Sequence, residues 1–322
     1  TELLALAAFP FAYRAFPRLR DRGFIFAKGL GVLLVSYLAW LGASLHVVPY
    51  TRMALLGLAL LLLGVAAWLA RRNWGEMLAF LRREWRTLLL EEGLYLAFFG
   101  ACLLIRMGNP DLWHPSRGGE KPMDLAYLNA IIKSTWFPPY DPWFAGGYIN
   151  YYYFGQVLVA TLVKLSGVVP ATAYNLAVPT LFAFTAMGAY SVIAGLLAPG
   201  QVDDGERRPA FDRAAQFGLF GALLITVLGN LGQVRLLVHG LWRTSQLDFR
   251  STIPGLAGTV KALDGLLQVL AGRPLSLNPD WWYWNATRVM AAGEINEFPY
   301  FTFLFGDLHA HLIALPFGLL AL

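Results

Sequence analysis

Long runs of apolar residues without a charged side chain are the feature that most limits how this chain can fold. Residues 29–45 and 55–70 contain no Asp, Glu, Lys or Arg, and with their flanks they approach the roughly 20 residues that cross a bilayer as a helix. An open strand cannot satisfy its backbone hydrogen bonds in lipid, so we predict helices. The runs lie at about 1–17, 24–47, 52–70, 93–108, 171–198, 214–238 and 312–322, with a weaker one at 151–168. The sequence therefore predicts an all-α, polytopic transmembrane helix bundle.

The charge and the cysteine content exclude several other classes of protein. Only 14% of the residues are charged, whereas a soluble domain usually carries about 25%. The formal charge of +5 comes from basic residues beside the apolar runs, a pattern that sets membrane topology and indicates no nucleic-acid partner. Cys102 is the single cysteine, which excludes an internal disulfide and a cysteine-based metal cluster. Membrane lipid is the partner that this composition indicates, and it leaves the oligomeric state open.

Basic residues in the short connections predict the orientation, because such residues gather on the cytoplasmic side. Three groups mark that side: Arg18, Arg20, Arg22 and Lys28; Arg71, Arg72, Arg82, Arg83 and Arg86; and Arg207, Arg208 and Arg213. Aromatic and leucine side chains among the second group predict an interfacial amphipathic helix there. Outer loops at 109–150 and 239–310 then follow, provided that 151–168 does not fully cross. If 151–168 does cross, the second loop lies in the cytoplasm.

We expect a single transmembrane domain over 1–322, made of N-terminal helices in 1–92 and a core with the two outer loops in 93–322. The sequence starts at Thr1 directly in an apolar run, and the run at 312–322 is about half a membrane crossing long. We therefore expect the chain to be a fragment, truncated at both ends.

The first outer loop offers three carboxylates and a group of tyrosines. Asp124 opens a helical pattern, and Glu120 lies four residues earlier, on the same helix face. Asp124 is expected either to stabilise the first turn of this helix or to take a proton or hold a metal above a cavity. Asp141 lies in a Pro- and aromatic-rich turn. Tyr151 and Tyr152 fit either an interfacial aromatic belt or a surface on which a sugar stacks.

Two stretches of this loop carry a family resemblance. EKPMDLAYLNAI and FPPYDPWFAGGYINYYYFG resemble the YYY-motif membrane family of bacteria and archaea (Chlor_Arch_YYY), whose function is not established. FPYFTFLFGDLHAH resembles a second signature of that family. More distantly, the first loop is similar to the GT-C superfamily of glycosyltransferases, which use polyprenyl-phosphate sugars.

The GT-C resemblance implies a fold, a substrate and a site. It implies a GT-C-like core in 93–322 whose outer loops bear short helices, and a polyprenyl-phosphate sugar donor. It places Asp124 where the first acidic residue of such enzymes falls, with Glu120 and Asp141 as further catalytic candidates. The sequence departs from the pattern because Leu125, and not a second acid, follows Asp124. The location it implies is a prokaryotic cytoplasmic membrane, with the active face outward.

The second outer loop has residues suited to a substrate that carries sugar and phosphate. Trp282 belongs to the aromatic cluster of residues 281–284 and offers a face for sugar stacking. Arg288 is expected either to bind phosphate oxygens or to pair with Glu294 or Glu297. We include Glu297 with Arg288 and Trp282 among the substrate-binding candidates.

The motif Asp307-Leu308-His309-Ala310-His311 predicts a metal site before the last apolar run. If the stretch is extended, Asp307, His309 and His311 point the same way and can bind a divalent ion such as Mg, Mn or Zn. If the stretch is helical, the three side chains point in different directions. Polar residues at the end of a membrane helix usually have a function.

Together these features predict a membrane glycosyltransferase that moves a sugar from a polyprenyl-phosphate donor to an acceptor on the outer face. A transporter or lipid-handling protein is one alternative, although the apolar runs contain few acids. A metal-dependent membrane hydrolase would explain Asp307, His309 and His311. A purely structural scaffold would leave the clustered polar residues unexplained.

Overall fold

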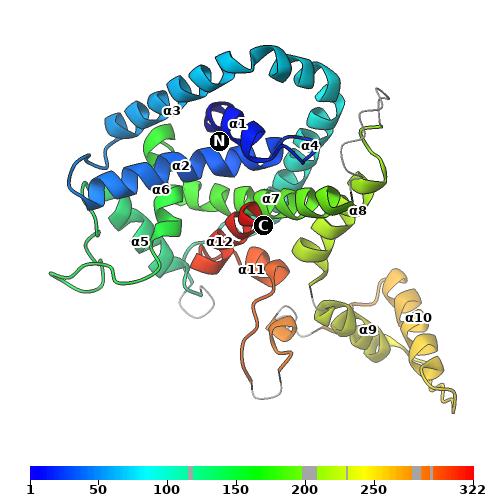
Figure 1. Cartoon of the computed structure of the whole chain (residues 1–322). Helices are drawn as coiled ribbons and strands as arrows, with labels where there is room; N and C mark the ends of the chain where they lie inside the picture. Colours follow the sequence, from blue (N-terminus) through cyan, green and yellow to red (C-terminus); the bar gives the residue numbers. More distant parts are fainter. Residues whose placement is uncertain (115–118, 198–208, 230, 278–283, 291–292) are drawn as a thin grey trace. The chain divides into compact units, whose positions relative to one another are not determined.

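Helices are the regular secondary structure of the described part of the chain. The structure, a computed structural model, describes residues 1–114, 119–197, 209–229, 231–277, 284–290 and 293–322. Within these ranges there is no strand, only an isolated bridge between Tyr140 and Tyr148. Figure 1 shows the helices in chain order. The prediction of an all-α fold is confirmed.

The helices fall into two compact units. The first unit is Thr1–Thr226 with Phe303–Leu322, and the second is Val227–Thr302, which overlaps most of the expected loop 239–310. The first contains α1 (Glu2–Ala15), α2 (Phe24–Ser44), α3 (Arg52–Arg72), α4 (Trp74–Gly108), α5 (Lys121–Lys133), α6 (Phe154–Ser166), α7 (Pro170–Leu197), α8 (Arg213–Leu223) and α12 (Ala310–Ala321). The second contains α9 (Gly232–Thr244), α10 (Leu256–Leu270) and the short 3₁₀ helix Trp284–Thr287. The π-turn Leu224–Leu228 and α11 (Pro299–Phe305) lie where the units join in sequence.

Four described helices are long and apolar enough to cross a membrane: α2, α3, α4 and α7. A fifth span results if residues 213–228 and 232–244 are counted together. Helix α6 has 13 residues and is therefore about 20 Å long, short of the roughly 30 Å hydrocarbon core. This length agrees with the expectation that 151–168 does not fully cross. The chain is thus an integral membrane protein.

Helix α4 differs from its prediction. The expected interfacial helix around 71–88 and the apolar run at 93–108 form one helix of 35 residues, Trp74–Gly108. The strong helix formers at 88–92, three leucines followed by two glutamates, leave no break between the two parts. Figure 1 shows that the helix curves along its length.

Two polar groups lie near opposite ends of the first unit. At one end Arg20 Nε binds Glu84 Oε2 at 3.1 Å and its Nη1 binds Asp212 Oδ2 at 3.0 Å, so the three predicted cytoplasmic segments meet there. Arg106 lies in the last turn of α4, about 33 Å of helix beyond Glu84. The second polar group, around Asp124, gathers near the Arg106 end, and Tyr174 in the first turns of α7 belongs to it.

The contact between α1 and α2 depends on a glycine. A Cβ at Gly31 would lie 2.3 Å from the carbonyl oxygen of Leu4 and 2.6 Å from its carbonyl carbon. Neither backbone atom can move away as a flexible side chain would. Small residues allow this close approach between helices in membrane proteins generally.

We therefore expect Gly31→Ala to separate α1 from α2 and to lower the free energy of unfolding by about 1–3 kcal/mol. Gly57→Ala is the matched control, since a Cβ at Gly57 in α3 meets nothing within 4 Å and alanine favours helix. Thermal unfolding of the detergent-solubilised protein compares the two. Equal melting temperatures for both variants would contradict the importance of this contact.

Candidate functional site

Asp124 is buried where three helices of the first unit meet. Helix α5 begins at Lys121, with Pro122 in the first turn, and this places the Asp124 side chain against α6 and α7. Its carboxylate is 2% exposed. Gln156 Nε2 donates to Oδ1 at 3.3 Å, and the Tyr174 hydroxyl donates to Oδ2 at 3.3 Å. The carboxylate thus bonds across to neighbouring helices, and it also lies in the first turn of its own helix, where a negative charge is favourable.

Asp307 lies beside this carboxylate, in the connection between α11 and α12. It is 1% exposed, and its Oδ2 accepts the backbone N–H of Glu120 at 2.9 Å. Its Oδ1 lies 3.1 Å from Lys121 Nζ. The Lys121 ammonium is itself buried and stands 4.2 Å from the centre of the Phe305 ring. The start of α5 is therefore fastened to the 306–309 connection by an ion pair and a hydrogen bond.

His309 completes the group. Its Nε2 lies 3.0 Å from Glu120 Oε2 and 3.5 Å from Asp307 Oδ2. The backbone of His309 is extended, and α12 begins only at Ala310. Asp307 and His309 consequently point the same way, as expected for an extended stretch. His311 lies one residue into the helix and is exposed, with its ring centre 5.5 Å from that of His309.

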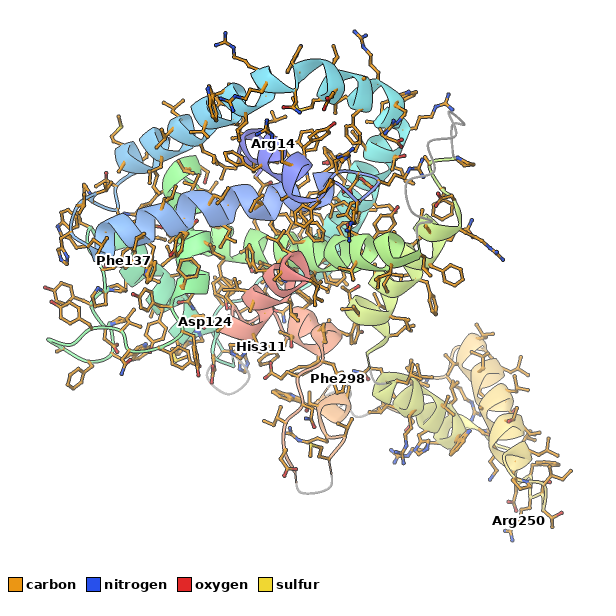
Figure 2. The ribbon with its side chains drawn as sticks, in the orientation of Figure 1. Arg14, Asp124, Phe137, Arg250, Phe298 and His311 are labelled. Carbon is orange, nitrogen blue, oxygen red and sulfur yellow. The ribbon has the colours of Figure 1, made fainter. Side chains whose placement is uncertain are left out.

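The first unit brings two of the predicted metal ligands together with Asp124. One ligand atom each from Asp124, Asp307 and His309 lies within 4.8 Å of the others, and the role of His311 as a third ligand stays a prediction. Two carboxylates and one imidazole suit a divalent ion such as Zn or Mn. Figure 2 shows Asp124 and His311 on adjoining parts of this region.

The electrostatics of the group are dominated by burial. Burial raises the pKa of Asp124 to about 7, and the negative charges of Asp307 and Glu120 act in the same direction. The His309 imidazole and the hydrogen bond from Tyr174 lower this pKa and only partly offset the rise. A carboxyl group with a pKa near neutrality, held at the end of a set of membrane helices, is typical of functional sites.

The other first-loop candidates lie apart from these contacts. Asp141 Oδ1 accepts the backbone N–H groups of Trp143 at 2.8 Å and Phe144 at 3.3 Å, which gives it a role in shaping the aromatic turn. Tyr151 and Tyr152 are exposed, and the Tyr151 ring centre lies 6.1 Å from that of Tyr127 on α5. These tyrosines flank the site on the surface.

The remaining candidates belong to the second unit or lie outside the described residues. Trp282 lies outside them. Arg288 Nη1 donates to Thr287 Oγ1 at 3.1 Å, and its guanidinium stands 5.9 Å from the centre of the Trp284 ring. Glu297 is half-buried. The substrate-binding roles of these residues stay predictions.

Several residues that hold the site are not among the candidates predicted from the sequence. They are Gly119, Lys121, Gln156 and Tyr174. Gln156 and Tyr174 lie in apolar helices, where a polar residue signals a function or a partner. The sequence shows these two polar residues, but it does not show that both donate to Asp124.

Gly119 is required by the close approach of α5 to the 306–309 connection. A Cβ there would lie 2.5 Å from the Phe305 ring and 2.6 Å from Asp307 Oδ2, and the residue has a φ of +61°. We expect Gly119→Ala to displace Asp307 and to lower the melting temperature markedly. Gly146→Ala is the matched control, because Gly146 also has a positive φ (+80°) but a Cβ there meets nothing within 4 Å. Similar losses in the two variants would show that backbone strain alone acts, and not the contact with Asp307.

Comparison with known proteins places the chain in a family. Neither the curated proteins nor the solved structures contain a match to it. A family model described as uncharacterized membrane protein (DUF2298) matches residues 34–322, a range that includes every residue of the candidate site. The chain therefore belongs to the DUF2298 family of membrane proteins.

Proposed function

We propose that this protein is a membrane glycosyltransferase that moves a sugar from a polyprenyl-phosphate donor to an acceptor on the outer face of a prokaryotic cytoplasmic membrane. The observation that carries the proposal is the buried Asp124 carboxylate, held by Gln156 and Tyr174 within 4.8 Å of Asp307 and His309. Asp124 is the general base that takes the proton of the acceptor hydroxyl as the bond to the sugar carbon forms. The lipid phosphate leaves with the electron pair of the broken bond.

An apolar pocket between helices that also carry residues of this group supports a lipid substrate. It has a volume of about 120 Å³ and is lined by residues of α2, α6, α7 and α12. Ile313 in its wall lies one helical turn beyond His309, and Ala173 and Ala177 flank Tyr174 on α7. A substrate with a polar head and a hydrocarbon chain can therefore place its head at Asp124 and its chain among apolar side chains.

The position of the group supports an outward-facing site. The basic connections meet around Arg20 near one end of the first unit, whereas Asp124 and Tyr174 lie near the other. Since basic connections gather on the cytoplasmic side, the Asp124 group then belongs to the outer side.

A divalent ion fits the donors of this group. Asp307 and His309 would hold it, and the ion would supply positive charge against the phosphate of the leaving group. The residues of the chain position this site: Lys121 orients Asp307 through its ion pair, and Glu120 orients His309.

The test is sugar transfer by the purified protein in vesicles. The donor is a polyprenyl phosphate carrying a labelled hexose, and native mass spectrometry of the protein from detergent identifies any co-purified lipid. We expect transfer of the label and a co-purified polyprenyl phosphate. Absence of transfer from hexose and pentose donors, with only bulk phospholipid bound, would contradict the proposal.

A metal-dependent hydrolase is the second candidate, favoured by the three clustered ligand atoms of Asp124, Asp307 and His309. In this reading Asp124 is a metal ligand and water attacks a bond of the substrate. Hydrolysis of the donor to free sugar without an acceptor, lost in EDTA and restored by Zn or Mn, would support it over sugar transfer.

A further inference from the structure

Arg106 is a buried cation whose hydrogen-bond partners are neutral. It is 6% exposed and lies in the last turn of α4. Its Nε donates to Asn175 Oδ1 at 2.6 Å, and its Nη2 donates to the backbone carbonyl of Asp111 at 3.2 Å. Within the described residues no carboxylate lies within ion-pair distance of its guanidinium. Burial of a charge in this way is unfavourable unless an anion compensates it.

Asn175, the partner of Arg106 on α7, is held with its uncharged carbonyl oxygen toward the guanidinium. Asn175 Nδ2 donates to the backbone carbonyl of Pro110 at 2.9 Å, so its Oδ1 is the atom that faces Arg106. The chain therefore holds the guanidinium in place with oxygen atoms that carry no formal charge. This arrangement keeps the positive charge available to a ligand.

The nearest buried carboxylate has its own cation. Asp307 lies one residue after Gly306, which touches Arg106, but Asp307 Oδ1 is 3.1 Å from Lys121 Nζ. Two buried cations, Arg106 and Lys121, thus share this end of the first unit with the buried carboxyl groups of Asp307 and Asp124. Asp124 accepts hydrogen bonds from side chains of α6 and α7, and Asp307 pairs with Lys121. An added anion can therefore pair directly with Arg106.

A glycine leaves one face of the guanidinium without a covering side chain. A Cβ at Gly306 would have Arg106 Nη1 as its nearest neighbour, at 3.1 Å, followed by Cζ at 3.5 Å and Nε at 3.8 Å. That position is at hydrogen-bond distance from Nη1, so any side chain there would cover this face of the guanidinium. Gly306 has a φ of +74°, which also favours glycine.

We propose that Arg106 is an anion site for a phosphate monoester, whose oxygens bind the guanidinium beside Gly306. Guanidinium groups match phosphate oxygens in pairs and remain charged when buried. The apolar pocket lined by Leu176, which follows Asn175 in α7, favours a phosphate carried on a lipid over free phosphate, and this part of the inference rests on the proposed function. The site differs from the sequence prediction, which gave the phosphate to Arg288.

The experiment measures phosphate binding to the full chain in detergent, by calorimetry and by the shift in melting temperature. The probes are farnesyl phosphate, inorganic phosphate and the neutral farnesol. We expect farnesyl phosphate to bind most tightly, inorganic phosphate to compete with it weakly and farnesol to leave the melting temperature unchanged. Equal binding of inorganic and farnesyl phosphate would keep the anion site but overturn the lipid source.

Two variants test the residue itself. Arg106→Gln removes the charge and is expected to weaken farnesyl phosphate binding about tenfold or more. Asn175→Asp keeps Arg106 but places a carboxylate against its Nε, and we expect a similar loss of affinity with the fold preserved. Arg52→Gln is the control, since this exposed arginine at the start of α3 donates to the Leu165 carbonyl, and binding should be unchanged.

Unchanged affinity in Asn175→Asp would overturn the proposal even if Arg106→Gln fails to fold. If Arg106 has only a structural role, the carboxylate introduced by Asn175→Asp would pair with it and stabilise the protein. The affinity for farnesyl phosphate would then stay the same. Sugar transfer is assayed separately. If phosphate binds through Arg106 but no sugar is transferred, the anion site stands and the proposed function is wrong. If sugar transfer is the same in both variants as in the wild type, the proposed function stands and the anion site is wrong.

Discussion

Asp124→Asn is expected to lower the rate of sugar transfer by a factor of about 10²–10⁴, the contribution typical of a general base. Asparagine has nearly the same shape and keeps a carbonyl oxygen for the amide of Gln156, so the packing of α5 against α6 is retained. What it cannot do is take a proton from an acceptor. Steady-state transfer from a labelled donor measures the loss.

The pH dependence gives the same prediction a second readout. Because the base acts in its ionised form and burial raises the pKa of Asp124 to about 7, transfer at a fixed, saturating concentration of the divalent ion should rise with pH, with a midpoint at or below about 7, and then level off. The ion concentration is held constant because a bound ion favours the ionised form of Asp124 and moves the rise to lower pH. Glu76→Gln, at an exposed position on α4, should leave both the rate and this pH profile unchanged.

Stability should change in the opposite direction from activity. The folded-state pKa of Asp124 lies above its ordinary value of 3.8, so the folded protein retains a proton that the unfolded chain has lost between about pH 4 and pH 7. The stabilisation is complete below pH 4 and is lost as the pH rises through 7. Asparagine cannot ionise, so at pH 8 the variant should be more stable than the wild type, by on the order of 3 kcal/mol. Full transfer activity in Asp124→Asn would rule out the base, and lower stability at pH 8 would indicate a structural carboxylate.

The helices were largely predictable because apolar runs report directly on the membrane. Residues 24–47, 52–70 and 171–198 correspond to α2, α3 and α7, and the weak run at 151–168 became a short helix. The error at α4 has a physical cause, since a helix can pass from a charged amphipathic part into an apolar part without any break. The amino-acid composition changes between the two parts, but the helical backbone continues unchanged.

The site was predictable only in its local parts. The two-residue spacing of Asp307 and His309 brings both side chains to one face of an extended segment, and this is a property of local backbone geometry. Their neighbour Asp124 comes from a helix far earlier in the chain, and no periodicity specifies which distant helices pack together. For the same reason Lys121 was not recognised as the partner of Asp307, nor Tyr174 as a donor to Asp124.

Asp307→Asn is expected to lower the free energy of unfolding by about 3–5 kcal/mol, because it removes the charge of one member of the buried ion pair between Asp307 and Lys121. It also weakens the bond from the Glu120 backbone N–H that fastens α5 to the 306–309 connection. Asp248→Asn is the matched control, since Asp248 forms an exposed pair with Arg250 at 3.4 Å. Exposed pairs contribute little, so that variant should unfold like the wild type. Chemical denaturation of the purified protein compares the two, and equal losses would show that burial of the Lys121 pair is unimportant.

Replacement of both partners separates the stability of this region from its function. In Lys121→Met/Asp307→Leu no buried charge is left without a partner, so we expect much of the stability lost in Asp307→Asn to return. Binding of a divalent ion should not return, because one of the ligands from the Asp124, Asp307 and His309 group is gone. A double variant that is stable, binds no Zn or Mn and transfers no sugar would show that the pair is kept for the chemistry of the site. If the double variant is as unstable as Asp307→Asn but still binds the ion, the pair serves the fold alone.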